Sequence, residues 1–152
     1  MSDSVGVKEL GHVVLYVTDI GRSSAFYREV LGWRQISPVG GAMPIAAFSG
    51  GRTHHELLLI EVGHDAAPIP HGRRVGLYHV GLKVGDSDDE LRAMIAQLKA
   101  ADANIVGMSD HGTTHSVYLL DPDGNEIEVY IDVPGVDWSD PRNMGPARPL
   151  HL

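Results

Sequence analysis

The stretch Gly11-His12-Val13-Val14-Leu15-Tyr16-Val17 returns 67 residues later, from His12 to His79, as Tyr78-His79-Val80-Gly81-Leu82-Lys83-Val84. Each copy has His in second place, followed by an apolar-rich run that ends in Val, a pattern typical of a buried strand. A strand pattern that recurs in this way indicates an internal duplication. We therefore predict that the chain carries two copies of one module.

A helix is predicted after each of these strands. In the first copy, residues 22–31 carry apolar side chains on one face, and Gly32 is a typical helix stop. In the second copy, residues 87–90 (Ser-Asp-Asp-Glu) form a capping box. The apolar residues after it fall at i, i+3, i+4 and i+7, one face of a helix: Leu91, Met94, Ile95 and Leu98.

Three strands are predicted after each helix, so that each module is a βαβββ unit. They are residues 33–37, 45–48 and 55–62 in the first copy, and 104–108, 115–120 and 126–131 in the second. The turn at residues 121–125 (Asp-Pro-Asp-Gly-Asn) joins the last two strands as a hairpin.

The modules are expected at residues 8–63 and 77–132, joined by a Pro- and Gly-containing linker (63–76). A βαβββ unit cannot bury its bare sheet face alone, whereas two units together can. The predicted fold class is therefore α+β, with two tandem βαβββ modules forming a curved mixed sheet around a metal-binding cavity, one domain over residues 8–132. The Pro-rich tail, residues 133–152, is expected to lie over the surface. A plainer alternative is an α+β sandwich with chance similarity at the strand starts.

Composition narrows the function. The 152 residues carry a formal charge of −8, which disfavours nucleic acid as a partner. There is no cysteine, so any metal must be held by His and carboxylate side chains. The N-terminus has no signal-peptide pattern, and no apolar run approaches the roughly 18 residues of a membrane span. We expect a cytoplasmic protein without a membrane partner.

Three residues are predicted to hold a metal ion: His12, His79 and Glu128. The two imidazoles occupy equivalent places in the repeat. In the last strand, apolar residues alternate with Glu128, which directs the carboxylate away from the helix and into the cavity. A carboxylate there is costly to bury unless it binds something positive. Two His and one carboxylate form the usual ligand set of non-haem Fe(II) oxygenases. The plainer interpretation of Glu128 is a solvated edge residue.

From about Lys8 to Ile131 the chain resembles the vicinal oxygen chelate (glyoxalase/bleomycin resistance/dioxygenase) superfamily. The strand-opening histidines, FYREVLG (residues 26–32) and DPDGNEIEVY (residues 121–130) carry the resemblance. Members include glyoxalase I, fosfomycin-resistance transferases, bleomycin-binding proteins, methylmalonyl-CoA epimerase and extradiol dioxygenases. One fold hosts these several chemistries, so the resemblance implies the fold more strongly than the reaction.

Narrower motifs resemble the extradiol ring-cleavage dioxygenases. Residues 111–128, HGTTHSVYLLDPDGNEIE, are similar to the signature of that branch. The signature begins before this stretch, and Ser109, two residues before His111, departs from it. His54-His55 looks like the pair that supplies its acid–base histidine, although Glu56 follows where the best-known members have a smaller residue. Those members carry four modules, and this chain resembles their catalytic half.

Glu56 leaves an alternative open, because metal-dependent glyoxalase I takes a fourth ligand from this strand. His55 and Glu56 are adjacent, so only one of them can face the cavity. The residues that share the parity of Glu56 are uniformly apolar, namely Leu58, Ile60 and Val62. We predict that this parity packs on the helix and that His55 points inward; a bulge at residues 53–54 would reverse the assignment.

The resemblance thus implies an Fe(II)-dependent extradiol dioxygenase acting on a catechol-type aromatic, with Mn(II) possible. The three ligands leave sites for two catechol oxygens and for dioxygen. His55 is the expected acid–base residue, Tyr118 is expected to bond a metal-bound oxygen, and His111 to bond substrate or order Tyr118. In the plainer interpretation, Tyr118 belongs to the core and His111 caps the turn at residues 110–112.

The alternative is a glyoxalase I-like lyase or isomerase that uses Glu56 with Ni(II) or Zn(II). A third possibility is a ligand-sequestering module like the bleomycin binders, which generally lack metal ligands. His115 has the wrong parity for the site, and His64, His71 and His151 are expected on the surface. The resemblance implies a homodimer or larger homo-oligomer, with a small aromatic substrate and dioxygen as partners.

Overall fold

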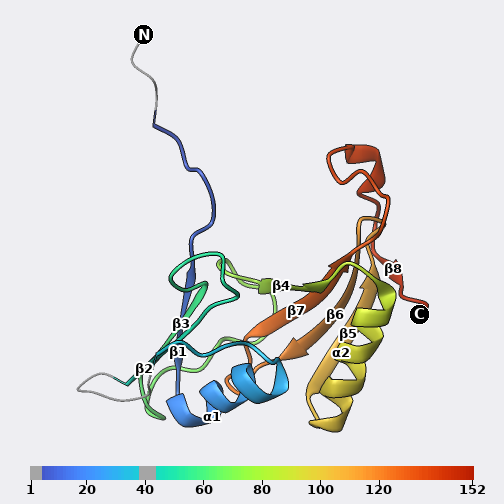
Figure 1. Ribbon diagram of the computed structural model, residues 1–152. Helices are drawn as coiled ribbons and strands as arrows, with labels where there is room; N and C mark the ends of the chain where they lie inside the picture. Colours follow the sequence, from blue (N-terminus) through green and yellow to red (C-terminus); the bar gives the residue numbers. More distant parts are fainter. Residues whose placement is uncertain (1–4, 38–43) are drawn as a thin grey trace. The chain divides into compact units, whose positions relative to one another are not determined.

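A computed structural model describes residues 5–37 and 44–152. The chain divides into two compact units, Met1–Ala66 and Ala67–Leu152, and each is described by itself. Both contain a mixed sheet and a helix, which gives an α+β fold (Figure 1). The boundary between the units falls inside the segment 63–76.

The first unit has a three-stranded sheet of order β1-β3-β2, in which β1 and β3 are parallel and β2 and β3 antiparallel. Its elements are β1 (Val13–Val17), α1 (Ile20–Ala25), the π-helical turn η1 (Phe26–Val30), β2 (Ile45–Phe48) and β3 (Leu57–Glu61). The helix begins two residues earlier than predicted because the Asp19 side chain accepts a hydrogen bond from the Arg22 amide at 2.8 Å and caps it.

One strand predicted for this unit is wrong. Residues 33–37 make a single antiparallel bridge, Gln35 to Phe48, in place of a strand. The Ser37 hydroxyl accepts from the Ala47 amide at 2.8 Å, and the Gln35 amide group donates to the Ser37 carbonyl at 2.8 Å. Side chains here take hydrogen bonds that a continuous ladder would give to the backbone.

The face predicted for β3 is also wrong. Leu57 and Leu59 are the buried side chains, while Leu58 and Ile60 are half-buried and Val62 is 42% exposed. Leu15 and Val17 of β1 share this buried face. Both parities of β3 are apolar, so their alternation carries no information about which one the helix covers.

The second unit has a five-stranded sheet of order β4-β7-β6-β5-β8. Only the β4–β7 pairing is parallel. Its elements are β4 (His79–Gly85), α2 (Asp88–Ala100), β5 (Asn104–Asp110), β6 (Thr114–Leu120), β7 (Glu126–Asp132), a 3-10 turn η2 (Pro141–Asn143) and β8 (Arg148–Pro149). From β4 to β7 this is the predicted βαβββ order.

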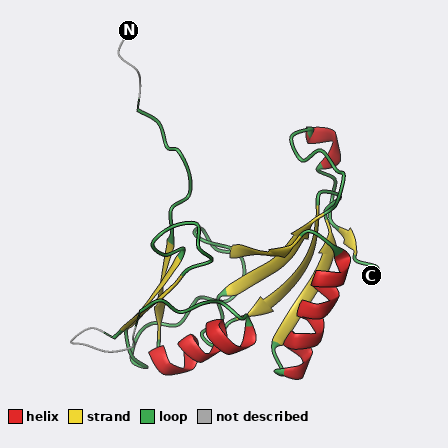
Figure 2. Cartoon of the chain, in the orientation of Figure 1, coloured by secondary structure: helices red, strands yellow, loops and turns green. Residues whose placement is uncertain are grey.

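Helix α2 covers one face of this sheet (Figure 2). Ser87 caps its first turn, because its side chain accepts from the Glu90 amide as the capping box predicts. Its hydroxyl also donates to the Glu90 carboxylate at 2.8 Å. Leu91 and Leu98 of the helix are fully buried. The sheet residues buried with them are Val117, Leu119, Ile127, Val129 and Ile131. The alternate residues of β6 and β7 therefore face away from α2.

The β6–β7 hairpin closes as predicted. The Asp121 carboxylate accepts from the amides of Asp123 at 2.9 Å and Asn125 at 2.8 Å, and Gly124 has φ +88°. This turn fixes the register in which Tyr118 lies opposite Glu128. None of the helices in the described ranges is both long and apolar enough to cross a membrane.

Candidate metal centre

In the second unit, strands β4, β6 and β7 bring His79, Tyr118 and Glu128 together on the face away from α2. His79 Nε2 lies 3.2 Å from Glu128 Oε2. The Tyr118 hydroxyl donates to the other carboxylate oxygen, Oε1, at 3.1 Å. His111 Nε2 lies 2.7 Å from the same hydroxyl. Since that hydroxyl donates to Glu128, His111 donates its Nε2–H, and the chain of bonds orders both Tyr118 and the carboxylate.

The surroundings of the Tyr118 hydroxyl keep it protonated. Burial, together with the neighbouring Glu128 carboxylate, raises the pKa of Tyr118 to about 12. A phenol at neutral pH is a hydrogen-bond donor, and it directs that donor at the predicted metal ligand. His111 thus contacts Tyr118, one of the two roles predicted for it.

The other nitrogen of His79 faces a residue that the sequence analysis missed. His79 Nδ1 lies 3.4 Å from Glu126 Oε1, and both atoms are buried with no hydrogen-bond partner among the described residues. A carboxylate on the second imidazole nitrogen orients a metal-binding histidine and raises its basicity. The signal was present, because Glu126 is two residues before Glu128 and so shares its face of β7.

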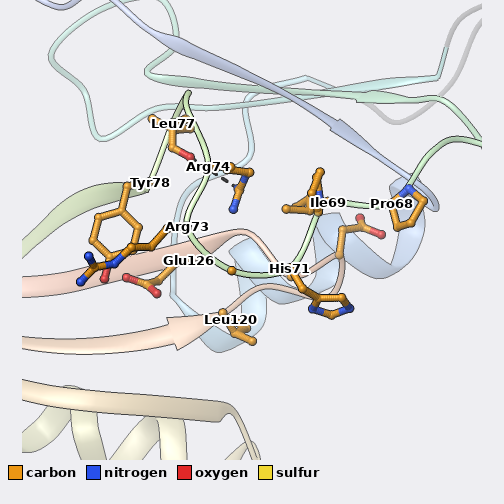
Figure 3. A pocket seen from close by; sticks show the side chains of 13 residues that line it. Pro68, Ile69, His71, Arg73, Arg74, Leu77, Tyr78, Leu120 and Glu126 are labelled. Carbon is orange, nitrogen blue, oxygen red and sulfur yellow. Dashed lines mark hydrogen bonds between the residues drawn. The ribbon is translucent and has the colours of Figure 1, made fainter.

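Glu126 also borders a cavity of about 810 Å³ under the segment that leads into β4. Tyr78 and Arg73 lie beside its carboxylate (Figure 3). The Glu126 charge, followed by burial, raises the pKa of Tyr78. Glu126 is therefore held between the metal-site histidine and this pocket.

In the first unit, three imidazoles cluster at the start of the sheet. The His55 ring centroid lies 4.6 Å from that of His12, and His54 is 6.0 Å from His12. The Nδ1 atoms of His54 and His55 are 2.6 Å apart, so one of them donates to the other. Burial, followed by the His54 and His12 charges, lowers the pKa of His55, which favours the neutral imidazole at pH 7.

Glu56 points elsewhere, into the loop before β3. Its Oε2 accepts from the Gly50 amide at 2.9 Å, and its Oε1 accepts from the amides of Arg52 and Thr53 at 3.1 and 3.2 Å. Burial alone would raise the pKa of Glu56, but these bonds outweigh it and lower the pKa. Arg52 in turn donates to the Gly11 carbonyl at 2.9 Å, next to His12. Glu56 thus holds the loop that steadies the first histidine.

The spacing of His79 and Glu128 fits two ligands of one metal ion. Two ligands at about 2.1 Å from one cation and at right angles lie about 3.0 Å apart. His79 Nε2 and Glu128 Oε2, at 3.2 Å, match this spacing. The buried, unpartnered Nδ1 of His79 facing Glu126 is also the arrangement expected for a coordinating imidazole. Within residues 5–37 and 44–152 no three His, Asp or Glu side chains converge on one point. Of the predicted ligands, His12 belongs to the first unit and the other two to the second.

The remaining histidines follow the predictions. His115 pairs with Asp88 on the helix side of the sheet, at 2.6 Å between Nδ1 and Oδ1. The others, His64, His71 and His151, are exposed.

Residues 9–129 match the family described as the Glyoxalase/Bleomycin resistance protein/Dioxygenase superfamily. The chain is 32% identical over 129 residues to the catechol-2,3-dioxygenase of Bacillus subtilis, covering 85% of this chain and 43% of that protein. It thus spans about two fifths of that relative's length.

A second relative is a probable lactoylglutathione lyase of Vibrio parahaemolyticus, 28% identical, with coverage of 78% of this chain and 86% of that protein. Among solved structures, a glyoxylase/bleomycin resistance protein/dioxygenase domain from Frankia superposes with a TM-score of 0.69 at 22% identity, over 84% of this chain and 99% of that one. The fold and the match over most of the length agree: the chain belongs to the Glyoxalase/Bleomycin resistance protein/Dioxygenase superfamily.

Proposed function

We propose that the protein is a non-haem Fe(II)-dependent extradiol dioxygenase that cleaves a catechol-type aromatic ring. The observation that carries the proposal is the series His111–Tyr118–Glu128–His79, in which one carboxylate oxygen accepts from a phenol and the other lies 3.2 Å from an imidazole nitrogen. The similarity to a catechol-2,3-dioxygenase supports the same reaction class.

We assign the metal ligands as His12, His79 and Glu128. Fe(II) bound there would bring catechol and dioxygen together and lower the pKa of the substrate hydroxyls. The neighbouring residues position these ligands. Glu126, with Oε1 at 3.4 Å from His79 Nδ1, would accept from the Nδ1–H of the metal-bound imidazole and orient its ring. Tyr118 fixes the rotamer of Glu128, and His111 fixes that of Tyr118.

We assign His55 as the group that takes a proton from the catechol hydroxyl and later returns one. Its ring contacts that of His12, and its lowered pKa keeps it neutral and able to accept. An imidazole within reach of substrate contributes typically 10²–10⁴-fold by such transfer. The Nδ1 atom of His54 lies 2.6 Å from His55 Nδ1 and so leaves Nε2 of His55 as the nitrogen that is free to accept.

The glyoxalase-type alternative needs Glu56 as a fourth ligand and base. Both oxygens of Glu56 already accept backbone hydrogen bonds within its own loop, three in all. Ligation by Glu56 would break these three bonds, two of which are exposed to solvent, and would require the loop to rearrange. This observation favours the dioxygenase, although a lactoylglutathione lyase is among the relatives.

The test is ring cleavage by the full chain loaded with Fe(II) under anaerobic conditions. Air-saturated catechol and 2,3-dihydroxybiphenyl are then added, and we expect a yellow semialdehyde product together with oxygen uptake. Glu128→Ala is expected to abolish both. Asp89→Asn, on the exposed side of α2, removes one negative charge elsewhere and serves as the matched control.

Absence of colour and of oxygen uptake across a panel of catechols, with one iron per chain confirmed by metal analysis, would refute the proposal. Loading with Ni(II) or Zn(II) and supplying the hemithioacetal of methylglyoxal and glutathione tests the alternative. Turnover there without oxygen uptake would establish it.

A further inference from the structure

A cleft of about 470 Å³ opens beside Glu128 in the second unit. Five of its six lining residues belong to strands β4, β6 and β7, and the sixth belongs to the C-terminal tail. The lining residues are Gly81, Thr114, Glu128, Tyr130, Asp132 and Trp138. The predicted metal ligand thus lies in one cleft with two aromatic side chains.

The space next to Glu128 exists because residue 81 has no side chain. A Cβ on Gly81 would lie 3.5 Å from Glu128 Oε2 and 3.4 Å from Tyr130 Cε1. Any larger side chain would fill the cleft at the carboxylate. The opening is therefore built next to the ligand, where a reacting ring has to lie.

The tail that carries Trp138 is fastened at both ends to the segment around His111. At one end the Val133 amide donates to the Thr113 carbonyl at 2.9 Å, and at the other β8 pairs with Ser109 and Asp110 of β5. Between these, the tail backbone packs on Gly112, where a Cβ would lie 2.6 Å from the Asn143 carbonyl oxygen. A segment held in this way presents Trp138 in a defined position.

Trp138 is nevertheless 75% exposed. The turn that bears it is ordered by its own bonds, since the Asp137 carboxylate accepts from the Ser139 amide at 2.9 Å and the Asn143 side chain donates to the Asp137 carbonyl at 2.8 Å. An indole carried on an ordered turn and left uncovered beside a cleft is available to stack on a ring.

The charges of the lining indicate which rings fit. No Lys or Arg lines the cleft, and the Asp132 carboxylate is paired with Lys83 at 2.6 Å. An anionic substituent on the substrate ring would be repelled by Asp132, and no basic residue of the lining would neutralise it. The lining suits an uncharged aromatic ring.

We propose that Trp138 is a specificity-determining residue that stacks on the substrate ring, and that the tail, residues 133–149, thereby selects uncharged aromatic catechols. This inference rests on the proposed function for its reaction but makes its own prediction about binding. Aromatic stacking is worth enough to change affinity about threefold to tenfold.

The experiment measures binding without turnover. In Trp33→Phe protein, Trp138 is the only tryptophan of the chain. 2,3-Dihydroxybiphenyl is titrated anaerobically into the metal-loaded protein while indole emission is recorded. We expect saturable quenching. By competition calorimetry we expect Trp138→Ala to weaken the probe threefold to tenfold, Trp138→Phe to restore most of the loss, and 2,3-dihydroxybenzoate to bind worse than the uncharged probe.

Met144→Ala is the matched control, since Met144 is an equally exposed tail side chain outside the cleft lining. Metal affinity measured in each variant must stay unchanged. Equal probe affinity in Trp138→Ala and wild type, or emission that does not respond at saturation, overturns the proposal. Quenching without ring cleavage would leave the inference standing and refute the dioxygenase; cleavage with unchanged KM in Trp138→Ala would do the reverse.

Discussion

Replacing Glu126 by Gln tests whether the unpaired atoms around His79 belong to a metal site. The substitution keeps the shape of the side chain and removes its charge. His79 Nδ1 and Glu126 Oε1 are 3.4 Å apart, and both are buried without a hydrogen-bond partner among the described residues. If metal binding at Nε2 brings them into a hydrogen bond, water cannot take the place of the carboxylate. A hydrogen bond to a charged group contributes about 1.5–3 kcal/mol and a neutral one about 0.5–1.5 kcal/mol.

The difference, about 1–1.5 kcal/mol, corresponds to roughly a tenfold rise in the metal Kd. Glu126→Ala removes the side chain that faces Nδ1, and a loss of up to about a hundredfold in metal affinity is expected, the upper range for residues that support a metal ligand. Both effects should appear in metal binding even if no substrate is ever turned over.

The assay is titration of Co(II) into metal-free protein, followed by the visible absorption of the bound ion and by competition with a chelator. Thermal unfolding of the metal-free variants checks that the fold is intact. Asp89→Asn makes the same change in net charge on an exposed surface of α2. A Kd for Glu126→Gln equal to that of wild type, or a loss equal to that of Asp89→Asn, would refute the reasoning.

Four further results are expected. Tyr118→Phe removes the donor to Glu128 and should raise the Co(II) Kd about threefold to tenfold, whereas an unchanged Kd would mean that the phenol does not order the ligand. His55→Ala should slow ring cleavage by about 10²-fold or more with the Co(II) Kd unchanged, and a parallel loss of metal would identify it as a ligand. Glu56→Gln should lower the free energy of unfolding at pH 7 by about 1–2 kcal/mol. Because the pKa of Glu56 in the folded protein lies below 4.5, its contribution to stability is full above that pH and is lost as the pH falls through the folded value. If urea melts show the same stability difference between wild type and Glu56→Gln at pH 7 and at pH 3, this reasoning is contradicted. Gly112→Ala, at φ +80° and against the Asn143 carbonyl, should release the tail to limited proteolysis, and wild-type resistance would count against the anchoring.

The parts of the fold that could be predicted are those with local chemistry. The capping box at Ser87, the turn at residues 121–125 and the period of α2 each depend on residues close together in the chain. Glu128 also followed from local alternation, because one parity of β7 is apolar and the other polar. Where both parities are apolar, as in β3, the same argument chose the wrong face. The strand at residues 33–37 failed because the Ser37 side chain takes the Ala47 amide, so that the backbone bonds of Arg34 and Ile36 to β2 and the residue after it amount to a single bridge, which composition does not reveal.

By itself the amino-acid sequence determined the α+β class, and it predicted the duplication and the two strand-opening histidines, since these depend on periodicity and spacing along the chain. Only the tertiary structure decided the partners. It brought Glu126 to the far nitrogen of His79, joined His111 through Tyr118 to Glu128, turned Glu56 into its own loop, and set Trp138 beside the cleft. Each of these is a contact between side chains whose direction depends on strand register and loop closure, and local sequence patterns carry no information about either.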